Sequence, residues 1–427
     1  MSTLKLYLDL VPWWAIILAA FGYTMIIILL PSRIRIQCAL AVMVVWLMFN
    51  KLVDLGFVQA LSKATAFSVY YGVGLAAVLQ PGPKRRLNPL VFIYPVMAVI
   101  AFLYVMTVTD RDVALVIRFQ WLVLVVSAIL LMRTVTDHVG LMRVLTGLMI
   151  GAAIGLLVLL SALVLNPAAT YARGLGRIFP YQANPNQIGL MFCLSVFVFG
   201  YFALRASNIT TRSLMIGFGA ISFGLGLLTG SRSVVVVMAI PLLPLLTAAT
   251  RRPVLTVLAI GIAYGVLSWV LGMAEERQLQ RLLSPTSERY ELIGHYIEVI
   301  KDRPIFGLAN TSGQSSGGHV GLTHPHNAYI EMLYLGGLTL AVPMGLLVCV
   351  SLGGAFYTWR HRHKLPTDPV LINCLAALMF ALYFHGFVNG TIYYPTYTWS
   401  FVHVFMSLLF MTLGIETFRY VKATKVV

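Results

Sequence analysis

Long apolar runs separated by short polar stretches dominate the chain. Many runs approach the 20 or so residues that an α-helix needs to cross the hydrocarbon core of a bilayer. Repeated spans of this kind indicate helices, which satisfy their backbone hydrogen bonds internally. We therefore predict an all-α fold, a polytopic transmembrane helical bundle that forms a single integral membrane domain over residues 1–427. The apolar segments lie near 12–30, 35–50, 57–80, 89–107, 112–132, 144–165, 186–204, 213–229, 233–248, 253–272, 327–358, 369–389 and 397–416.

Basic clusters recur in every second loop between these segments and predict the topology. They are Lys84-Arg85-Arg86, Arg133 with Arg143, Arg205 with Arg212, Arg251-Arg252, Arg360 to Lys364, and Arg419 with Lys422. By the positive-inside rule these loops are cytoplasmic, and loops 166–185, 229–233, 273–325 and 390–396 face outward. Thirteen spans with a cytoplasmic C-terminus would place the N-terminus outside. We favour about twelve spans with both termini in the cytoplasm. In that case one of the first three apolar segments does not cross the membrane fully.

Composition agrees with a membrane protein. Apolar residues make up 59% of the chain and charged residues 10%, with a mean hydropathy of +0.87, whereas an average soluble domain is about a quarter charged. The net charge of +16 largely follows the topological bias. Because the basic residues are spread over short loops, they form no nucleic-acid-binding face. Each of the four cysteines lies within an apolar run without CxxC spacing, which predicts a packing role.

The longest polar stretch, residues 273–325, predicts a long outward loop that contains an amphipathic helix. Ser287 is a plausible N-cap and Pro304 follows the polar end, so the helix should cover 288–302. One face carries Leu292, Ile293, Tyr296, Ile297, Val299 and Ile300. Arg289 falls at the centre of this apolar face and should point toward the membrane interface. It is either a positioned phosphate ligand or an arginine that merely reaches a lipid headgroup.

Three further arginines lie in outward loops, where the positive-inside rule does not explain them. Arg232 follows Gly230 in the tight turn Thr229-Gly230-Ser231-Arg232-Ser233. An arginine at that depth is costly unless it is paired or lines a wet cavity, and its planar fork suits phosphate oxygens. Arg173 and Arg177 are four residues apart, so one helical turn would aim both the same way. The glycines between them argue equally for a flexible loop.

The long loop ends in His324-Pro325-His326-Asn327, where the next span begins. The partial positive charge of a helix N-terminus disfavours imidazolium, so His326 should stay neutral and able to accept a proton. A general base near pH 7 requires this property. Asn327 is expected to cap the helix or to orient the imidazole.

Two other patterns in the sequence could form metal sites. Asp110-Arg111-Asp112 has the spacing of a divalent-metal pair, but Arg111 between the acids already explains it as a salt bridge. His324 and His326 could share zinc, yet no acidic or cysteine partner stands nearby. We therefore expect no metal and no cofactor.

The order of motifs around the outward loop resembles a known family. Thr229–Arg232, Arg289, Pro304–Gly307, His324–Asn327 and Gly336–Gly337 follow one another within residues 170–340. This ligase-like region resembles the O-antigen ligase and polymerase superfamily, and most of all the O-antigen ligases of Gram-negative bacteria. Ile293 departs from the leucine that usually ends the family's arginine motif.

The resemblance implies a glycosyltransferase of lipopolysaccharide biosynthesis in the bacterial inner membrane, with its active site facing the periplasm. Such ligases transfer O-antigen polysaccharide from an undecaprenyl-pyrophosphate donor to a lipid A-core acceptor. Here His326 would be the catalytic base, and Arg232 and Arg289 would bind the pyrophosphate. Arg173, Arg177, His324 and Asn327 are further candidates for substrate binding.

Two alternatives stay open. A polymerase of the same superfamily would extend the glycan on its lipid carrier. A transporter or flippase would use the arginines as a path for anionic lipid-linked substrates. Transporters usually place ionisable groups near the midplane, whereas the polar groups here gather at one interface.

Overall fold

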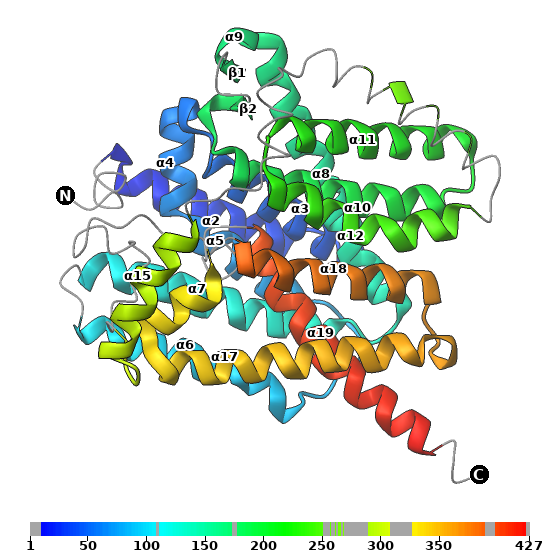
Figure 1. The fold of residues 1–427 in the computed structure, drawn as a ribbon. Coiled ribbons are helices and arrows are strands. Elements are labelled where there is room, and N and C mark those ends of the chain that lie inside the picture. The colour runs from blue at the N-terminus through cyan, green and yellow to red at the C-terminus, as the bar shows by residue number, and fades with distance from the viewer. Residues whose placement is uncertain are drawn as a thin grey trace.

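The computed structural model describes residues 10–107, 111–172, 177–250, 289–307, 327–388 and 398–423, together with residues 257, 261, 264, 265 and 268. Helices make up nearly all of the secondary structure in this part of the chain, accompanied by one short antiparallel strand pair. Most helices run side by side in a bundle (Figure 1). The all-α polytopic fold predicted from the sequence is thus confirmed.

The helices fall into a long and a short group. Eight described helices are long and apolar enough to cross a membrane, or nine when the bent pair 35–49 and 53–64 counts as one span. The long helices are α7 (Arg111–Thr134), α8 (His138–Leu165), α10 (Pro185–Arg205), α11 (Ile209–Leu228), α12 (Arg232–Ala249), α17 (Ala328–Arg360), α18 (Pro369–Val388) and α19 (Thr398–Ala423). The total of about twelve spans stays a prediction, because most of segment 253–272 lies outside the described residues.

The remaining elements are shorter. The α-helices among them are α2 (Trp13–Leu29), α3 (Arg35–Phe49), α4 (Gly56–Ala64), α5 (Ala66–Val78), α6 (Ile93–Leu103), α9 (Pro167–Thr170) and α15 (Arg289–Asp302). Strands β1 (Tyr171–Ala172) and β2 (Arg177–Ile178) pair with each other. The 3-10 turns are η1 (Val53–Leu55), η2 (Pro89–Phe92), η3 (Tyr104–Thr107), η4 (Pro180–Gln182) and η5 (Arg362–Lys364).

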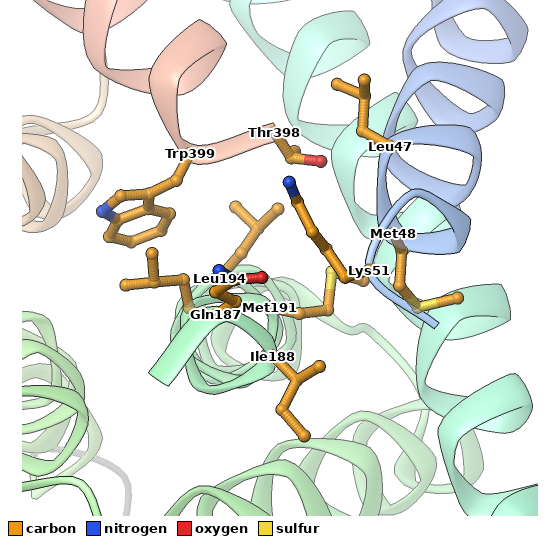
Figure 2. A pocket seen from close by; sticks show the side chains of 10 residues that line it. Leu47, Met48, Lys51, Gln187, Ile188, Met191, Leu194, Thr398 and Trp399 are labelled. Atoms are coloured by element: carbon orange, nitrogen blue, oxygen red, sulfur yellow. The ribbon is translucent and has the colours of Figure 1, made fainter. Parts of the chain in front are cut away.

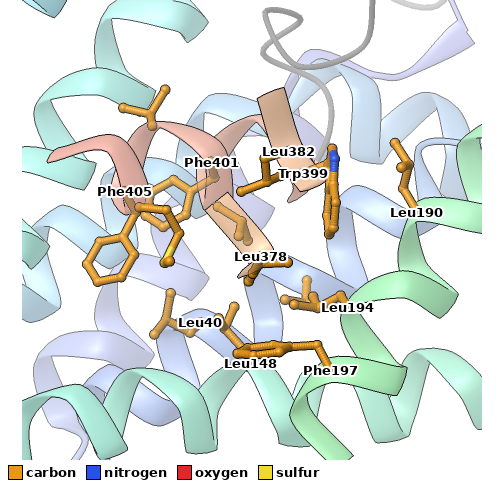
Figure 3. Packing of buried hydrophobic residues seen from close by; sticks show 14 of the residues in the cluster. Leu40, Leu148, Leu190, Leu194, Phe197, Leu378, Leu382, Trp399, Phe401 and Phe405 are labelled. Carbon is orange, nitrogen blue, oxygen red and sulfur yellow. The ribbon is translucent and has the colours of Figure 1, made fainter. Parts of the chain in front are cut away.

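The bundle has one continuous apolar core. Figure 3 shows leucine and aromatic side chains of α3, α8, α10, α18 and α19 meeting there, among them Leu40, Leu148, Leu194, Leu378 and Phe401. These elements pack as neighbours: α10 lies against α8, α11 and α12, and α18 lies against α12 and α17. Large apolar side chains also cover the outside of the bundle, as expected of a surface that contacts lipid.

The predicted cytoplasmic clusters gather at one end of the bundle. The backbone amide of Arg85 donates to the Arg133 carbonyl oxygen at 2.7 Å, and the Arg85 guanidinium lies 3.3 Å from the Glu416 carboxylate. Arg205 at the end of α10 forms an ion pair with Asp368 before α18. These contacts join the end of α7 to α19, and the end of α10 to the start of α18. We refer to this end as the basic end and to the other as the outward end.

The first helix differs from the favoured prediction. Arg35, at the turn between α2 and α3, donates to the Leu79 carbonyl oxygen at 3.0 Å, beside the basic end. Val11 and Ala15, at the start of α2, pack on Ala60 of α4, which follows η1 at the outward end. The described chain therefore begins and finishes at opposite ends of the bundle, whereas the prediction placed both ends on one side. The reason is that α2 passes from the outward end to the basic end.

Candidate functional site

Arg177 is held by a short hairpin at the outward end. β1 and β2 pair in antiparallel fashion, and the Phe179 amide donates to the Thr170 carbonyl oxygen at 2.7 Å. Arg177 Nη2 donates to Asn186 Oδ1 at 3.4 Å and to the Gly230 carbonyl oxygen at 3.5 Å. The helical turn considered for residues 173–177 is wrong at Arg177, which lies in a strand. The strand brings its guanidinium to the start of α10 and to the turn before α12.

The turn between α11 and α12 places Arg232 beside this contact. Gly230 has a φ of +61°, a conformation that glycine adopts without strain, and it allows α12 to begin two residues later. Arg232 is the first residue of α12 and is exposed. A helix N-terminus carries partial positive charge, so Arg177, Arg232 and the helix end together favour an anion.

The first turn of α12 is fixed against α10. Val234 packs so closely on Gly189 that a Cβ there would lie 2.2 Å from the valine Cγ2, and Cys193 Sγ contacts the Val234 carbonyl oxygen at 3.6 Å. Gly200 meets Leu245 in the same way further along. The two helices therefore run parallel, and both begin at the outward end.

The start of α17 lies at the same end. Asn327 Oδ1 accepts from the amides of Tyr329 at 3.0 Å and Ile330 at 3.1 Å, which confirms the predicted N-cap. The Tyr329 hydroxyl donates to the Tyr383 carbonyl oxygen at 2.8 Å, and its ring lies 4.5 Å from the Phe387 ring. These contacts attach the start of α17 to the last turns of α18. Because α18 packs on α12 and runs antiparallel to it, Asn327 and Arg232 lie at the same end of the bundle.

The predicted amphipathic helix is present as α15, Arg289–Asp302. Tyr296 is fully buried, and its ring lies 4.7 Å from that of Tyr334 in an edge-on arrangement. Val299 and Ile300 pack beside it against α17. Ile297, predicted to share the apolar face, is 43% exposed, since the contact with α17 is narrower than the apolar arc. Arg289, the first residue of this helix, lies about two turns before Tyr296.

Two glycine motifs form one contact that fixes α15 on α17. Helix α17 breaks at Gly337, where φ is +57° and ψ is −154°. The amides of Leu338 and Thr339 donate instead to the carbonyl oxygens of Pro304, at 2.8 Å, and Ile305, at 3.2 Å. The segment after α15 thus occupies the break in α17. We call this contact the glycine clamp, formed by residues 304–307 and 336–339.

The clamp has no room for larger residues. A Cβ at Gly337 would lie 2.3 Å from the Ile305 carbonyl oxygen, and one at Gly307 would lie 2.5 Å from the Tyr334 carbonyl oxygen. Gly307 also has a positive φ of +56°. Both glycines are therefore needed for the close backbone approach.

Comparison with known families agrees with this arrangement. Residues 217–345 match the family described as O-antigen ligase. This match covers less than a third of the chain and supports a place in the O-antigen ligase superfamily. The matched region includes Arg232, α15, the glycine clamp and Asn327. No curated protein matches the chain.

The positions of some residues that are expected to act in an O-antigen ligase stay predictions. His326, His324 and Arg173 lie outside the described residues, as does Asp110 of the rejected metal pair. Arg289 begins α15, and its inward orientation stays a prediction. Arg177, Arg232 and Asn327 are described, and all three lie at the outward end.

Several polar residues at this end were not singled out from the sequence. Asn186 meets Arg177, and Gln187 after it lines a pocket with Lys51 and Thr398. Figure 2 shows Lys51 extending from the end of α3 into this pocket, whose walls are apolar residues of α3 and α10. Lys51 could have been identified from the sequence, because it is a cation in a loop at the outward end. Asn186 is harder to identify, because its only distinguishing feature is its place as the second residue of a helix capped by Asn184.

Proposed function

We propose that this protein is an O-antigen ligase, a glycosyltransferase that acts at the periplasmic face of the inner membrane. The donor would be polysaccharide on undecaprenyl pyrophosphate, and the acceptor would be lipid A-core. The observation that carries the proposal is the position of Arg232. It begins a helix at the outward end, beside Arg177, within the region that matches the O-antigen ligase family.

In the proposed reaction, His326 takes the proton from a hydroxyl group of the acceptor. The acceptor oxygen attacks the anomeric carbon in line and forms the new glycosidic bond with inversion. The bond between that carbon and the pyrophosphate oxygen breaks, and undecaprenyl pyrophosphate leaves with the bonding electron pair. Asn327 supports His326 by fixing the start of α17, where its side chain caps two amides.

Arginines stabilise the leaving group in this proposal. Negative charge builds up on the pyrophosphate as the bond breaks, and donors already aimed at that charge lower the barrier. Arg232 and Arg289 would bind the pyrophosphate, and Arg177, with Arg173 and His324, would help to hold substrate phosphates. Permanently charged guanidinium groups would then fill the role that a metal ion has in other transferases, so the reaction should continue in EDTA.

Identification of the product tests the function. Purified wild-type protein would be supplied with carrier-linked glycan and lipid A-core, and compared with Arg232→Lys and Arg232→Ala. We expect modified lipid A-core from wild type and a loss of about 100-fold or more in kcat/KM for the alanine variant. Lysine keeps the charge without the fork and should retain intermediate activity.

The other candidate functions give different products. Longer carrier-linked chains with unmodified lipid A-core would show a polymerase. Translocation of lipid-linked substrate in vesicles without any glycosyl transfer would show a transporter. Either result would contradict the proposal.

A further inference from the structure

Arg177 and Arg232 at the outward end form what we call the arginine cluster. A separate cavity at the same end has a different chemistry. It lies where η1 meets the end of α8, α9 and η4, and its polar lining consists of Asp54, Asn166, Thr170 and Gln182, with Tyr181 beside them. Its volume of about 380 Å³ falls within the range of small-molecule sites. No lysine or arginine is among the described residues that line it. The lining therefore does not favour a phosphate.

Of the four polar residues that line the cavity, Thr170 and Asn166 already form hydrogen bonds within the protein, whereas Asp54 and Gln182 can bind a ligand. The Thr170 hydroxyl donates to the Ala162 carbonyl oxygen at 3.0 Å, and Asn166 Oδ1 accepts from the Ala169 amide at 3.3 Å. The side chains of Asp54 and Gln182, in contrast, form no hydrogen bond or ion pair within the described part of the chain, and both are exposed. A carboxylate and an amide facing one cavity offer acceptors and donors to a polyhydroxylated ligand.

The backbone around Gln182 is held in an uncommon conformation. Tyr181 and Gln182 have φ values of +50° and +55°, which residues other than glycine rarely adopt. The Tyr181 hydroxyl is fixed by a 2.7 Å hydrogen bond with Ser161 Oγ. Strain of this kind persists where the surroundings impose it, and here it presents the Gln182 amide and the Tyr181 ring to the cavity.

The cavity adjoins the arginine cluster through the hairpin. Thr170 lines the cavity and immediately precedes β1, and the Phe179 amide closes the hairpin onto the Thr170 carbonyl oxygen. Arg177 lies on the second strand of the same hairpin and reaches Gly230. A ligand in the cavity and a phosphate at Arg177 would thus lie on either side of one short structural unit.

From this arrangement we propose that the cavity binds a neutral pyranose unit of a glycan substrate. Asp54 and Gln182 would form hydrogen bonds with the sugar hydroxyls, and Tyr181 would contribute an aromatic surface. This inference rests on the proposed glycosyl transfer, and it adds a saccharide subsite to the phosphate-binding cluster. The sugar belongs either to the acceptor core or to the donor chain.

Steady-state kinetics of Asp54→Asn and Gln182→Gly test the subsite. Glycine keeps the positive φ and removes the amide, while the matched control Gln182→Asn keeps an amide and tolerates the same φ. Thermal unfolding verifies that each variant folds. Loss of a hydrogen bond to a charged group corresponds to about tenfold or more in affinity, and loss of one to a neutral group to about fivefold. We therefore expect Asp54→Asn to raise one KM by about tenfold and Gln182→Gly to raise the same KM by about fivefold. The control should change it less, and kcat should stay within about twofold.

The substrate whose KM rises identifies the source of the sugar. A change for lipid A-core assigns the cavity to the acceptor, and a change for carrier-linked glycan assigns it to the donor. Unchanged KM values for both substrates in folded variants would overturn the inference and leave the proposed function intact.

Direct binding separates the inference from the proposed function. Delipidated core oligosaccharide and delipidated O-antigen polysaccharide would be titrated against wild type and Asp54→Asn without any reaction. Weaker binding of either glycan to the variant supports the subsite even if wild type shows no transfer. Equal binding of both glycans to the two proteins overturns it.

Discussion

Gly307 and Gly337 are important because neither position has room for a side chain. Each has a positive φ, and each would place a Cβ within 2.5 Å of a backbone oxygen of the other segment. The two amides released by the break at Gly337 are satisfied by carbonyl oxygens three residues or less from Gly307. Inside a membrane protein such amides would otherwise be unsatisfied at considerable cost. The two glycines are therefore structural requirements of the site.

Alanine at Gly337 should separate the two halves of the clamp. We expect Gly337→Ala to destabilise the protein by about 3 kcal/mol, because a backbone clash and a strained φ act together. The measurement is thermal unfolding in detergent. Gly345→Ala is the matched control, since it lies in the same helix with nothing within 4 Å of an added Cβ and should be neutral or slightly stabilising. Equal unfolding temperatures for the two variants would contradict the clamp.

At the scale of elements, α15 is positioned by its contact with α17. Tyr296 is its fully buried side chain, packed against Tyr334, and the clamp follows at its C-terminal end. The start of α15 is thereby fixed relative to α17. The proposed placement of Arg289 near the start of α17 depends on this attachment.

Removal of the Tyr296 ring should release α15. We expect Tyr296→Ala to cost about 3 kcal/mol of local stability and to reduce glycosyl transfer, while the unfolding of the bundle changes little. Hydrogen exchange of the α15 amides measures the release. Ile297→Ala on the exposed side should stay within about 0.5 kcal/mol of wild type. If α15 amides exchanged equally fast in Tyr296→Ala and Ile297→Ala, Ile297 would contribute as much as Tyr296 to the packed face, and the narrow contact would be contradicted.

Sequence periodicity predicts these elements well but predicts their contacts poorly. The limits of α15, the tight turn before Arg232 and the cap at Asn327 follow from local signals, and the structure confirms them. The contact of Arg177 with the turn before α12 and the clamp do not, because they depend on residues far apart in the chain. The Arg177 contact joins positions 177 and 230, and the clamp joins 304–307 to 336–339. Segment 57–80 likewise divides into α4 and α5 at Thr65, a break within an apolar run.

At the scale of the whole molecule, the bundle separates its charges. At the basic end, Arg85 connects the end of α7 to Glu416 of α19, and Arg205 connects the end of α10 to Asp368 before α18. The outward end carries the hairpin, the Arg232 turn and the start of α17. The positive-inside rule predicts that the basic end faces the cytoplasm, and the proposed function then requires the candidate site to face the periplasm.

Cysteine labelling of intact spheroplasts tests this orientation. In a background lacking the four native cysteines, Ala168→Cys at the outward end should react with a membrane-impermeant maleimide. Arg86→Cys at the basic end should react after the membrane is permeabilised. Both positions are exposed, so accessibility within the protein does not limit either reaction. Labelling in the reverse order would contradict the topology and the periplasmic site together.

The proposed reaction is metal-independent ligation with His326 as the base. Its most direct test is transfer by purified protein in detergent and EDTA, with carrier-linked glycan and lipid A-core, comparing wild type with folded His326→Ala. We predict modified lipid A-core from wild type and at least about 100-fold slower formation by the variant. Equal rates in the two proteins would contradict the role of His326. Loss of wild-type transfer in EDTA, restored by magnesium, would contradict the metal-independent mechanism.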